Sequence, residues 1–409
     1  MRRPWRPIAA LALLAGLGGT ALARALPGGA AAVLALPGTP ASVLALDPLT
    51  GRGFVPATAP GGRMRIASVD VRSGRLLRSV DAGTTILALA TDSGSRRLYL
   101  LDTAGGGFIP WIDMATGRRG GSLDAGPGIA LAMVADARAG RLLVQVDAGG
   151  TFRTVTFDSH SGRILAVRAD FGPEDFWNPV VDEATHRAFF SVSGLVGAIY
   201  SIGAVRVLDT RTGQPLATTR LSGAVSALAI DPLAGRVAAV AGTTLTLLDS
   251  RTGLPVRTAS LPPGTALLIM DPRTGHTFVV AGDGQLTIVD TRSGAVLAHA
   301  SVGAVSRAIA MDRPRHRVLV VVADYVRRTA VLQVLDSRTG RLHRSLPIPL
   351  FPRALGIDEA TGKVLIAGIV IERRDPWAWL PDWARHLPPF PASPPPRDGT
   401  GAIIILEPG

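Results

Sequence analysis

The sequence predicts an all-β fold made of eight similar four-stranded units, and three observations lead to this prediction. Two turn motifs alternate along the chain, short apolar runs flank each motif, and the first motif recurs every 40 to 49 residues. Apolar runs of this length, rich in Val, Ile, Leu and Thr, are typical of strands rather than helices. Four-stranded units that recur at this period are typical of the blades of a β-propeller.

The first turn motif is an aspartate that ends an apolar run, as in the Asp-Pro-Leu-Ala-Gly segment at residues 231–235. An aspartate can accept hydrogen bonds from backbone N–H groups two and three residues later, and a glycine can adopt the left-handed conformation that closes a hairpin. Where glycine is replaced, we expect Arg96, His186 and His316 to adopt the same conformation. The eight aspartates of this motif are Asp47, Asp92, Asp136, Asp182, Asp231, Asp271, Asp312 and Asp358.

The second motif has the pattern Asp-x-Arg-Thr/Ser-Gly in its clearest copies and predicts a second turn in each unit. In unit five the two turns separate four predicted strands at residues 225–231, 236–241, 244–249 and 255–261. The aspartates of this motif are Asp70, Asp113, Asp158, Asp209, Asp249, Asp290 and Asp336, with Glu407 in the eighth place.

The last unit predicts how the ring closes. It has three predicted strands, at residues 353–358, 363–368 and 402–407, and no fourth. Residues 31–36 precede the first unit and have strand periodicity, so we expect this N-terminal strand to complete the last blade. Such closure would remove two exposed sheet edges.

The first 25 residues predict an export signal. Arg2, Arg3 and Arg6 form a basic start, an apolar stretch follows, and residues 21–23 form an Ala-x-Ala cleavage site, with a second candidate at 23–25. The uncharged stretch of 16 residues is shorter than the roughly 20 of a membrane-spanning helix. We therefore expect a propeller of residues 26–409 that is exported to the periplasm or the extracellular space, with no membrane span once the signal is removed. An uncleaved signal would be an N-terminal membrane anchor.

Composition excludes several kinds of site. The chain has 409 residues, a formal charge of +12 and no cysteine. Without cysteine it has no disulfide framework, no thiol nucleophile and no cysteine-ligated zinc. Removal of four arginines with the signal would lower the charge to +8, and the remaining arginines are spread along the chain with few aromatic residues among them. We therefore expect no specific nucleic-acid binding.

Two segments carry a resemblance to a known family. Residues 229–253 contain AIDPLAGRVAAVAG and LTLLDSRTG, and residues 334–346 read VLDSRTGRLHRSL. These segments resemble the YVTN-type β-propeller repeat family, a WD40-like family of exported bacterial proteins, over about residues 30–409. The resemblance implies a propeller and export but no particular ligand. Members of that family are similar to seven-bladed rings, so seven blades is the alternative to the eight counted here.

Eight blades also suggest a comparison with pyrroloquinoline-quinone dehydrogenases. Their docking motif resembles Asp-x-x-Thr-Gly with a tryptophan four residues after the glycine. None of the corresponding positions here is tryptophan, which disfavours a quinoprotein. These positions are Arg78, Gly121, Ala166, Ala217, Arg257, Ala298 and Arg344.

Irregular aromatic loops predict a binding face. Both aspartate turns of each blade should lie on one face of the disc, and the remaining connections on the other. The second face should carry the loop at 169–179 and the Trp- and Pro-rich insertion at 369–401, which we expect to cap the disc, to bind a partner, or both. Variable loops on a rigid ring are a common arrangement for binding a protein, a glycan or a small molecule. The candidate binding residues are Trp111, Phe171, Trp177, Tyr200, Tyr325, Arg327, Arg328, Trp377, Trp379 and Trp383.

Arginine recurs at one position of the second motif and predicts a basic ring on the opposite face. These residues are either solvated turn residues or a surface that attracts an acidic polymer. They are Arg72, Arg211, Arg251, Arg292 and Arg338.

No motif in the sequence specifies a reaction. The histidines lack metal-ligand spacing, and no nucleophile elbow, P-loop or H-E-x-x-H pattern is present. We predict no catalytic residue, no metal and no cofactor, and we expect a monomeric, exported binding module. The alternatives are a propeller enzyme, quinoprotein-like or lyase-like, with a site at the channel mouth, and a structural repeat protein like those of surface layers.

Overall fold

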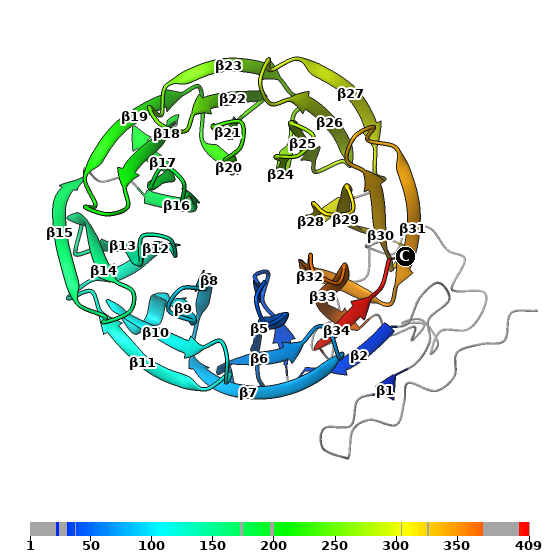
Figure 1. Ribbon diagram of the computed structural model, residues 1–409, viewed down its shortest axis with the longest axis horizontal. Helices are drawn as coiled ribbons and strands as arrows, with labels where there is room; N and C mark the ends of the chain where they lie inside the picture. Colours follow the sequence, from blue (N-terminus) through cyan, green and yellow to red (C-terminus); the bar gives the residue numbers. More distant parts are fainter. Residues whose placement is uncertain are drawn as a thin grey trace, which may run out of the picture.

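Eight antiparallel sheets form a closed ring around a central axis (Figure 1). The computed structural model describes residues 22–23, 31–36, 38–171, 175–196, 200–303, 305–324, 327–370 and 401–408. Each sheet has one strand next to the axis and three further out, as in the blade of a propeller. The predicted eight-bladed β-propeller is therefore confirmed, and the seven-bladed alternative is not.

The innermost strands line the centre of the ring, one for each of blades 1 to 8. They are β4 (Ala45–Asp47), β8 (Ile86–Asp92), β12 (Ile129–Asp136), β16 (Asp175–Asp182), β20 (Val225–Asp231), β24 (Thr265–Asp271), β28 (Val305–Asp312) and β32 (Leu350–Asp358). In blade 1 a further short strand, β3 (Thr39–Pro40), pairs with the same neighbour as β4.

The two middle strands of each blade follow in chain order. The second strands are β5 (Arg52–Thr58), β9 (Arg97–Asp102), β13 (Arg141–Asp147), β17 (Arg187–Val196), β21 (Arg236–Ala241), β25 (His276–Ala281), β29 (Arg317–Asp324) and β33 (Lys363–Val370). The third strands are β6 (Met64–Asp70), β10 (Phe108–Asp113), β14 (Phe152–Asp158), β18 (Tyr200–Asp209), β22 (Thr244–Asp249), β26 (Gln285–Asp290), β30 (Thr329–Asp336) and β34 (Gly401–Leu406).

The outer strands form the rim of the disc. They are β7 (Arg75–Gly83), β11 (Arg119–Asp124), β15 (Ile164–Phe171), β19 (Pro215–Leu221), β23 (Pro255–Ser260), β27 (Val296–Ser301), β31 (Leu342–Ile348) and, for blade 8, β2 (Ala31–Ala35). A two-residue strand, β1 (Leu22–Ala23), pairs with β2, and a single 3-10 turn, η1 (Thr103–Gly105), follows β9.

Burial explains why the middle strands are almost continuously apolar. Each blade packs face to face on its two neighbours, so both sides of a middle strand are covered. In β33 the side chains from Val364 to Gly368 are all buried, whereas outer strand β23 is exposed or half-buried throughout. The core is therefore a series of layers between blades.

The aspartate turns form as predicted. The Asp249 carboxylate accepts the N–H groups of Arg251 and Thr252, both at 3.0 Å, and Gly253 has a φ of 72°. The three residues that replace glycine in the first motif also adopt positive φ, between 53° and 58°. An aspartate side chain and one left-handed residue are therefore sufficient to set these hairpins.

The N-terminal strand closes the ring as predicted. Strand β2 pairs with β34, from Ala31 opposite Leu406 to Ala35 opposite Ala402. Leu34 and Leu36, each 3% exposed, pack in one cluster with Ile403 and Ile405. Hydrogen bonding and apolar burial together hold the two ends of the propeller in one blade.

Two predicted segments lie mostly outside the described residues. Strand β33 ends at Val370 and β34 begins at Gly401, so both ends of the predicted insertion at 369–401 are strand residues. Residues 371–400 lie outside the described residues. Of the predicted signal at 1–25, the structure describes Leu22 and Ala23, in β1. No helix among the described residues is long and apolar enough to cross a membrane.

Replacing the closure leucine tests how far the ring depends on β2. We expect Leu34→Ala to lower the stability by about 2–5 kcal/mol, because it opens a cavity in the β2–β34 layer. The measurement is thermal unfolding followed by circular dichroism. Leu49→Ala is the control, because Leu49 is 66% exposed. Equal melting temperatures for the two variants would contradict the assigned role of β2.

Candidate functional site

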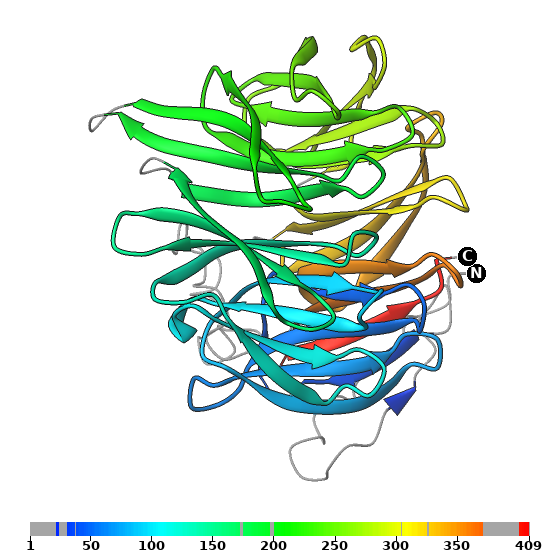
Figure 2. The same ribbon diagram turned by 60° about the vertical axis from the view of Figure 1, so that its left-hand side comes forward.

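The two faces of the disc differ in construction. We call the end that carries both aspartate turns of every blade the Asp-turn face. The other end carries the connections from second to third strands and from each outer strand to the next blade, and we call it the loop face. Figure 2 shows the disc from the side, with the loop face to the left.

Blade 4 extends furthest on the loop face. Strands β17 and β18 each have ten residues and pair from Arg187 opposite Asp209 to Val196 opposite Tyr200. In Figure 2 the coloured part of this green hairpin lies at the upper left, on the loop face. Trp177 lies in β16 of the same blade, opposite Ser191, and Phe171 is the last residue of β15 in blade 3. Three predicted binding residues thus belong to strand ends of blades 3 and 4.

The predicted loop at 169–179 needs correction, because most of it is strand. Strand β15 continues to Phe171 and β16 starts at Asp175, so Phe171 and Trp177 are strand residues. Both strands gain ladder partners by this extension, Phe152 for Phe171 and Ser191 for Trp177. Backbone pairing with the blade thus overrides the polar composition from which a loop was predicted.

Trp111 is also a strand residue rather than a loop residue. It lies in β10, and the Arg97 guanidinium carbon is 4.3 Å from the centre of its ring. Arg97 in turn donates hydrogen bonds of 2.8 Å to the carbonyl groups of Ser159 and His160 in blade 3. A Cβ atom added at Gly120 would overlap the indole ring, so the tryptophan is closely packed. Trp111 therefore supports the contact between blades 2 and 3.

The remaining predicted residues are on other blades. Arg327 follows β29 in blade 7, its backbone N–H bonds to Asp324 at 2.9 Å, and its side chain is 83% exposed. Arg328 has a positive φ of 51°. Tyr325, Trp377, Trp379 and Trp383 lie outside the described residues.

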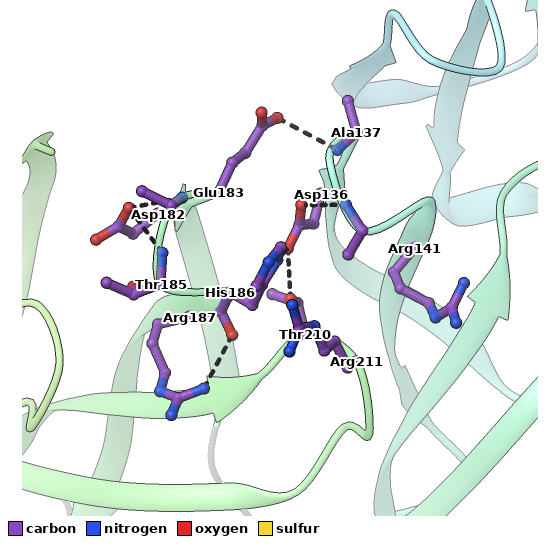
Figure 3. A network of polar contacts seen from close by, with 12 residues as sticks. Asp136, Ala137, Arg141, Asp182, Glu183, Thr185, His186, Arg187, Thr210 and Arg211 are labelled. Atoms are coloured by element: carbon purple, nitrogen blue, oxygen red, sulfur yellow. Dashed lines mark hydrogen bonds and ion pairs between the residues drawn. The ribbon is translucent and has the colours of Figure 1, made fainter.

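A buried polar network joins blades 3 and 4 on the Asp-turn face (Figure 3). The Asp136 carboxylate at the end of β12 is fully buried. Its Oδ2 atom accepts the Thr210 hydroxyl at 2.5 Å and lies 2.9 Å from Nδ1 of His186, and its Oδ1 accepts the N–H of Ala139 at 2.9 Å. A buried carboxylate needs such partners, because its desolvation is otherwise costly.

A second contact at the same boundary comes from Glu183 (Figure 3). Its carboxylate in blade 4 accepts the N–H of Ala137 in blade 3 at 3.2 Å. Burial raises the pKa of Glu183, although this hydrogen bond lowers it in part. Within blade 4, Arg187 bonds to Asp209 at 2.8 Å, so the turns of one blade are also tied to each other.

Other blade boundaries repeat the contact between a first-motif aspartate and the next blade. Asp271 in blade 6 accepts the Ser337 hydroxyl of blade 7 at 2.7 Å, and His276 lies 2.9 Å from the Ser337 carbonyl. Asp358 in blade 8 accepts Nε of Arg72 in blade 1 at 3.1 Å. In Asp136 and Asp271 one oxygen orders the turn and the other accepts a hydrogen bond from the next blade, a contact that we call the clamp. In Asp358 a single oxygen, Oδ2, accepts both the Thr361 hydroxyl of its own turn and Arg72 of blade 1.

The clamp is unsuited to catalysis. Thr210 and His186 both contact the same carboxylate oxygen, so the hydroxyl is bonded to the acid and not to the imidazole. Nucleophilic catalysis needs the hydroxyl bonded to the base. Among the described residues, no group of three or more His, Asp or Glu side chains is arranged to hold a metal ion. The arrangement therefore stabilises the blade boundary.

A recurring hydroxyl residue in the sequence is the signal for this clamp, and the turn motifs alone did not predict its role. The residue after the second-motif aspartate is a hydroxyl residue in five blades and is at most 1% exposed in each. The hydroxyls of Thr210 and Ser337 bond to the first-motif aspartate of the preceding blade, and this partner is identified only when the blades are placed side by side. The Thr291 hydroxyl instead bonds to Thr277 within its own blade. The five residues are Ser159, Thr210, Ser250, Thr291 and Ser337.

Not every boundary satisfies its buried carboxylate. Oδ2 of Asp182 and Oγ of Ser250 occupy the corresponding positions of blades 4 and 5, and both are buried without a hydrogen-bond partner. Oδ2 of Asp231 is in the same condition, and burial raises the pKa of the Asp231 carboxyl. The second-motif aspartates behave in the opposite way. The Ser293 hydroxyl lowers the pKa of Asp290, and the Ser161 N–H lowers the pKa of Asp158.

Two homologous hydroxyls provide a test of the clamp. We expect Thr210→Val to lower the stability by about 1–3 kcal/mol, because it leaves the buried Asp136 oxygen short of a donor. Ser250→Ala removes a hydroxyl that has no partner, so it should leave stability unchanged or raise it. Chemical denaturation compares the two variants with the unmodified chain, and a larger loss for Ser250→Ala would contradict the clamp.

The second-motif turns predict a pH dependence. Because the folded pKa of Asp290 is below its unfolded value, its carboxylate stabilises the fold above the unfolded pKa, and this stabilisation is lost as pH falls through the folded pKa. Ser293→Ala should therefore destabilise the chain at neutral pH, and the difference should fade in acid. Thr243→Ala on the loop face is the control for urea denaturation at each pH. A Ser293→Ala effect that persists undiminished below that pKa would contradict this origin.

A comparison with known protein families matches part of the chain. A family model described as outer membrane protein assembly factor BamB matches residues 201–371, which is less than half of the chain. No curated protein sequence matches.

Solved structures share the fold at low identity. The computationally designed Ika8 protein matches with a TM-score of 0.61 and 19% identity, over 82% of this chain and 94% of that chain. Dihydro-heme d1 dehydrogenase NirN, in complex with DHE, matches with a TM-score of 0.59 and 12% identity, over 76% of this chain and 66% of that chain. At these identities the likeness shows the fold alone, and the chain is a β-propeller similar to these structures.

Proposed function

We propose that this chain is an exported binding module that takes up an extended segment of a protein partner at the β17–β18 hairpin on its loop face. The observation that carries the proposal is an unpaired stretch of sheet edge. Outer strand β19 pairs with β18 only as far as Gly203, and inner strand β16 pairs with β17 only as far as Ser193. Beyond these residues the described hairpin continues for three more pairs, to Val196 opposite Tyr200.

A two-stranded ribbon of this kind has backbone groups on both edges without a strand partner in the described blade. Such edges are templates for a strand from another chain, and strand addition is a recurrent way to bind extended peptides. The neighbouring strand ends carry Phe171 and Trp177, and aromatic residues are enriched in protein interfaces. Backbone pairing would provide affinity, and the aromatic strand ends would provide selectivity.

Two further observations support an exported protein that binds other proteins. The first 25 residues have the order of a signal peptide, with a basic start, an apolar stretch and an Ala-x-Ala site. The family model that matches residues 201–371 is described as an outer membrane protein assembly factor, and its match includes the second half of the hairpin. An assembly factor acts by contacting other proteins, which agrees with a binding role.

Shortening the hairpin tests the proposal directly. In the test variant, Asn-Gly replaces residues 194–202 and connects Ser193 to Gly203 as a two-residue hairpin turn. We expect unchanged melting of the ring and loss of the envelope proteins that the unmodified chain captures from an envelope extract, read by quantitative mass spectrometry. The flanking residues Val192 and Ala204, which pack in a core cluster of this blade, are kept in the variant, so the layers between blades should be unaffected.

A matched control shortens another loop on the same face. Asn-Gly replaces residues 148–151, between Asp147 and Phe152 of blade 3. This control should keep the captured proteins. Identical capture by the unmodified chain and both variants, or equal loss with both variants, would contradict a role for the β17–β18 hairpin.

A further inference from the structure

The Asp-turn face carries arginines that point away from the fold. Arg211, Arg251 and Arg292 occupy the same turn position in blades 4, 5 and 6, and all three are exposed. Among the described residues their guanidinium groups have no hydrogen bond or ion pair. Their backbone is fixed, since the N–H groups of Arg211 and Arg251 bond to Asp209 and Asp249 at 2.9 and 3.0 Å.

The acidic groups of the same blades are less exposed than the arginines, with side-chain exposures of 21% for Asp209 and 34% for Asp249. The carboxylates of Asp209 and Asp249 accept backbone N–H groups of their turns and pair with Arg187 and Arg236. Asp231 and Asp271 are fully buried. The positive charges therefore project into solvent while the negative charges are held within the turns, so this part of the face presents a positive potential.

Exposed leucines accompany these arginines. The three most exposed large apolar side chains of the described residues are Leu233 at 74%, Leu49 at 66% and Leu254 at 59%. All three lie in turns of the Asp-turn face, two of them in blade 5 beside Arg251. Aliphatic residues also follow the turns on the rim, where Leu216 is 47% and Leu297 is 51% exposed. A soluble surface gains nothing from leucines at the tips of its turns.

We propose that the Asp-turn face, centred on Arg211, Arg251, Arg292, Leu233 and Leu254, is a docking surface for a lipid bilayer that contains anionic phospholipids. Arginines that project toward the bilayer would attract the lipid phosphates, and the two leucines of blade 5 would insert among the acyl chains. This surface is independent of the loop face. A disc attached in this way would present its β17–β18 hairpin away from the membrane.

The leucines decide between a bilayer and a soluble acidic polymer. A polymer such as polyglutamate offers charge but no apolar interior, so it would be attracted by the arginines and would not benefit from Leu233 and Leu254. A bilayer favours both, because its phosphates attract the arginines and its acyl chains take the leucine side chains out of water. Two largely exposed turn leucines on the same face as three exposed arginines therefore fit a membrane better.

Vesicle flotation tests the proposal with the full chain. We expect binding to vesicles of equimolar phosphatidylcholine and phosphatidylglycerol, little binding to phosphatidylcholine alone, and weaker binding at high salt. The triple variant Arg211→Gln, Arg251→Gln, Arg292→Gln should bind about a hundredfold more weakly, at about fivefold for each arginine. The matched control carries Arg63→Gln, Arg220→Gln and Arg353→Gln, which remove the same charge away from the Asp-turn face, and it should keep its binding. Absence of binding to the anionic vesicles, or equal loss in both triple variants, would overturn the proposal.

A leucine variant separates a membrane from an acidic polymer. Leu233→Ser with Leu254→Ser should weaken binding to the anionic vesicles and leave any binding to polyglutamate unchanged. Vesicle binding that is unaffected by these two changes would overturn the bilayer proposal and favour a polymer.

The absence of cysteine allows a direct readout of orientation. A single cysteine introduced as Leu233→Cys or Thr243→Cys carries an environment-sensitive fluorophore on opposite faces of blade 5. Anionic vesicles should shift the emission of the label at position 233 to the blue and leave the label at position 243 unchanged. A shift confined to position 243, or equal shifts at both positions, would overturn the assigned face.

Discussion

Ring closure is the constraint on which the remaining structure depends. Seven blades are hairpin-connected sheets formed from consecutive sequence, but blade 8 takes its outer strand, β2, from the other end of the chain. The five pairs between β2 and β34 fix the relative position of the first and last blades. Once the ends are joined, every middle strand is covered on both sides, and the layers between blades become a continuous core.

The Asp-turn face shows how repeated turns become a clamp between blades. The same aspartate orders its own turn through one oxygen and contacts the next blade through the other, as Asp136 does with Thr210 and His186. The copies are unequal, because Asp182 and Ser250 occupy the same positions without forming the bond. Each boundary thus combines a common backbone arrangement with its own polar contacts. Positions where the aspartate bonds to the next blade and positions where it does not therefore make different contributions to stability.

The two faces suit different kinds of contact. The Asp-turn face is regular, its exposed arginines recur in blades 4, 5 and 6, and blade 5 adds two exposed turn leucines, which suits a broad, planar surface such as a bilayer. On the loop face the β17–β18 hairpin of blade 4 continues for three pairs past its flanking strands, against one pair for the β29–β30 hairpin of blade 7, and this longer ribbon suits one specific partner segment. A rigid ring between the faces would hold a membrane and a partner at a constant separation.

The sequence by itself determined the repeat, the four strands of each blade, the turn chemistry and the closing strand. These features follow from local rules, in which an aspartate, a left-handed residue and flanking apolar runs define a hairpin without reference to the rest of the chain. Unit five shows this most clearly, since its predicted strands differ from the observed ones by a single residue at the end of the fourth.

Only the tertiary structure decided what lies between blades. The sequence predicts Trp111 as a binding residue in or beside a loop, and the contacts of Arg97 with its ring and with the next blade place it at a packed boundary. The partners of Asp136 come from residues fifty and seventy-four positions away, and the edge at Ser193 and Gly203 exists because two flanking strands stop there. Sequence patterns report the pairing of neighbours along the chain, whereas these contacts arise when separate blades meet, so they depend on the geometry of the closed ring.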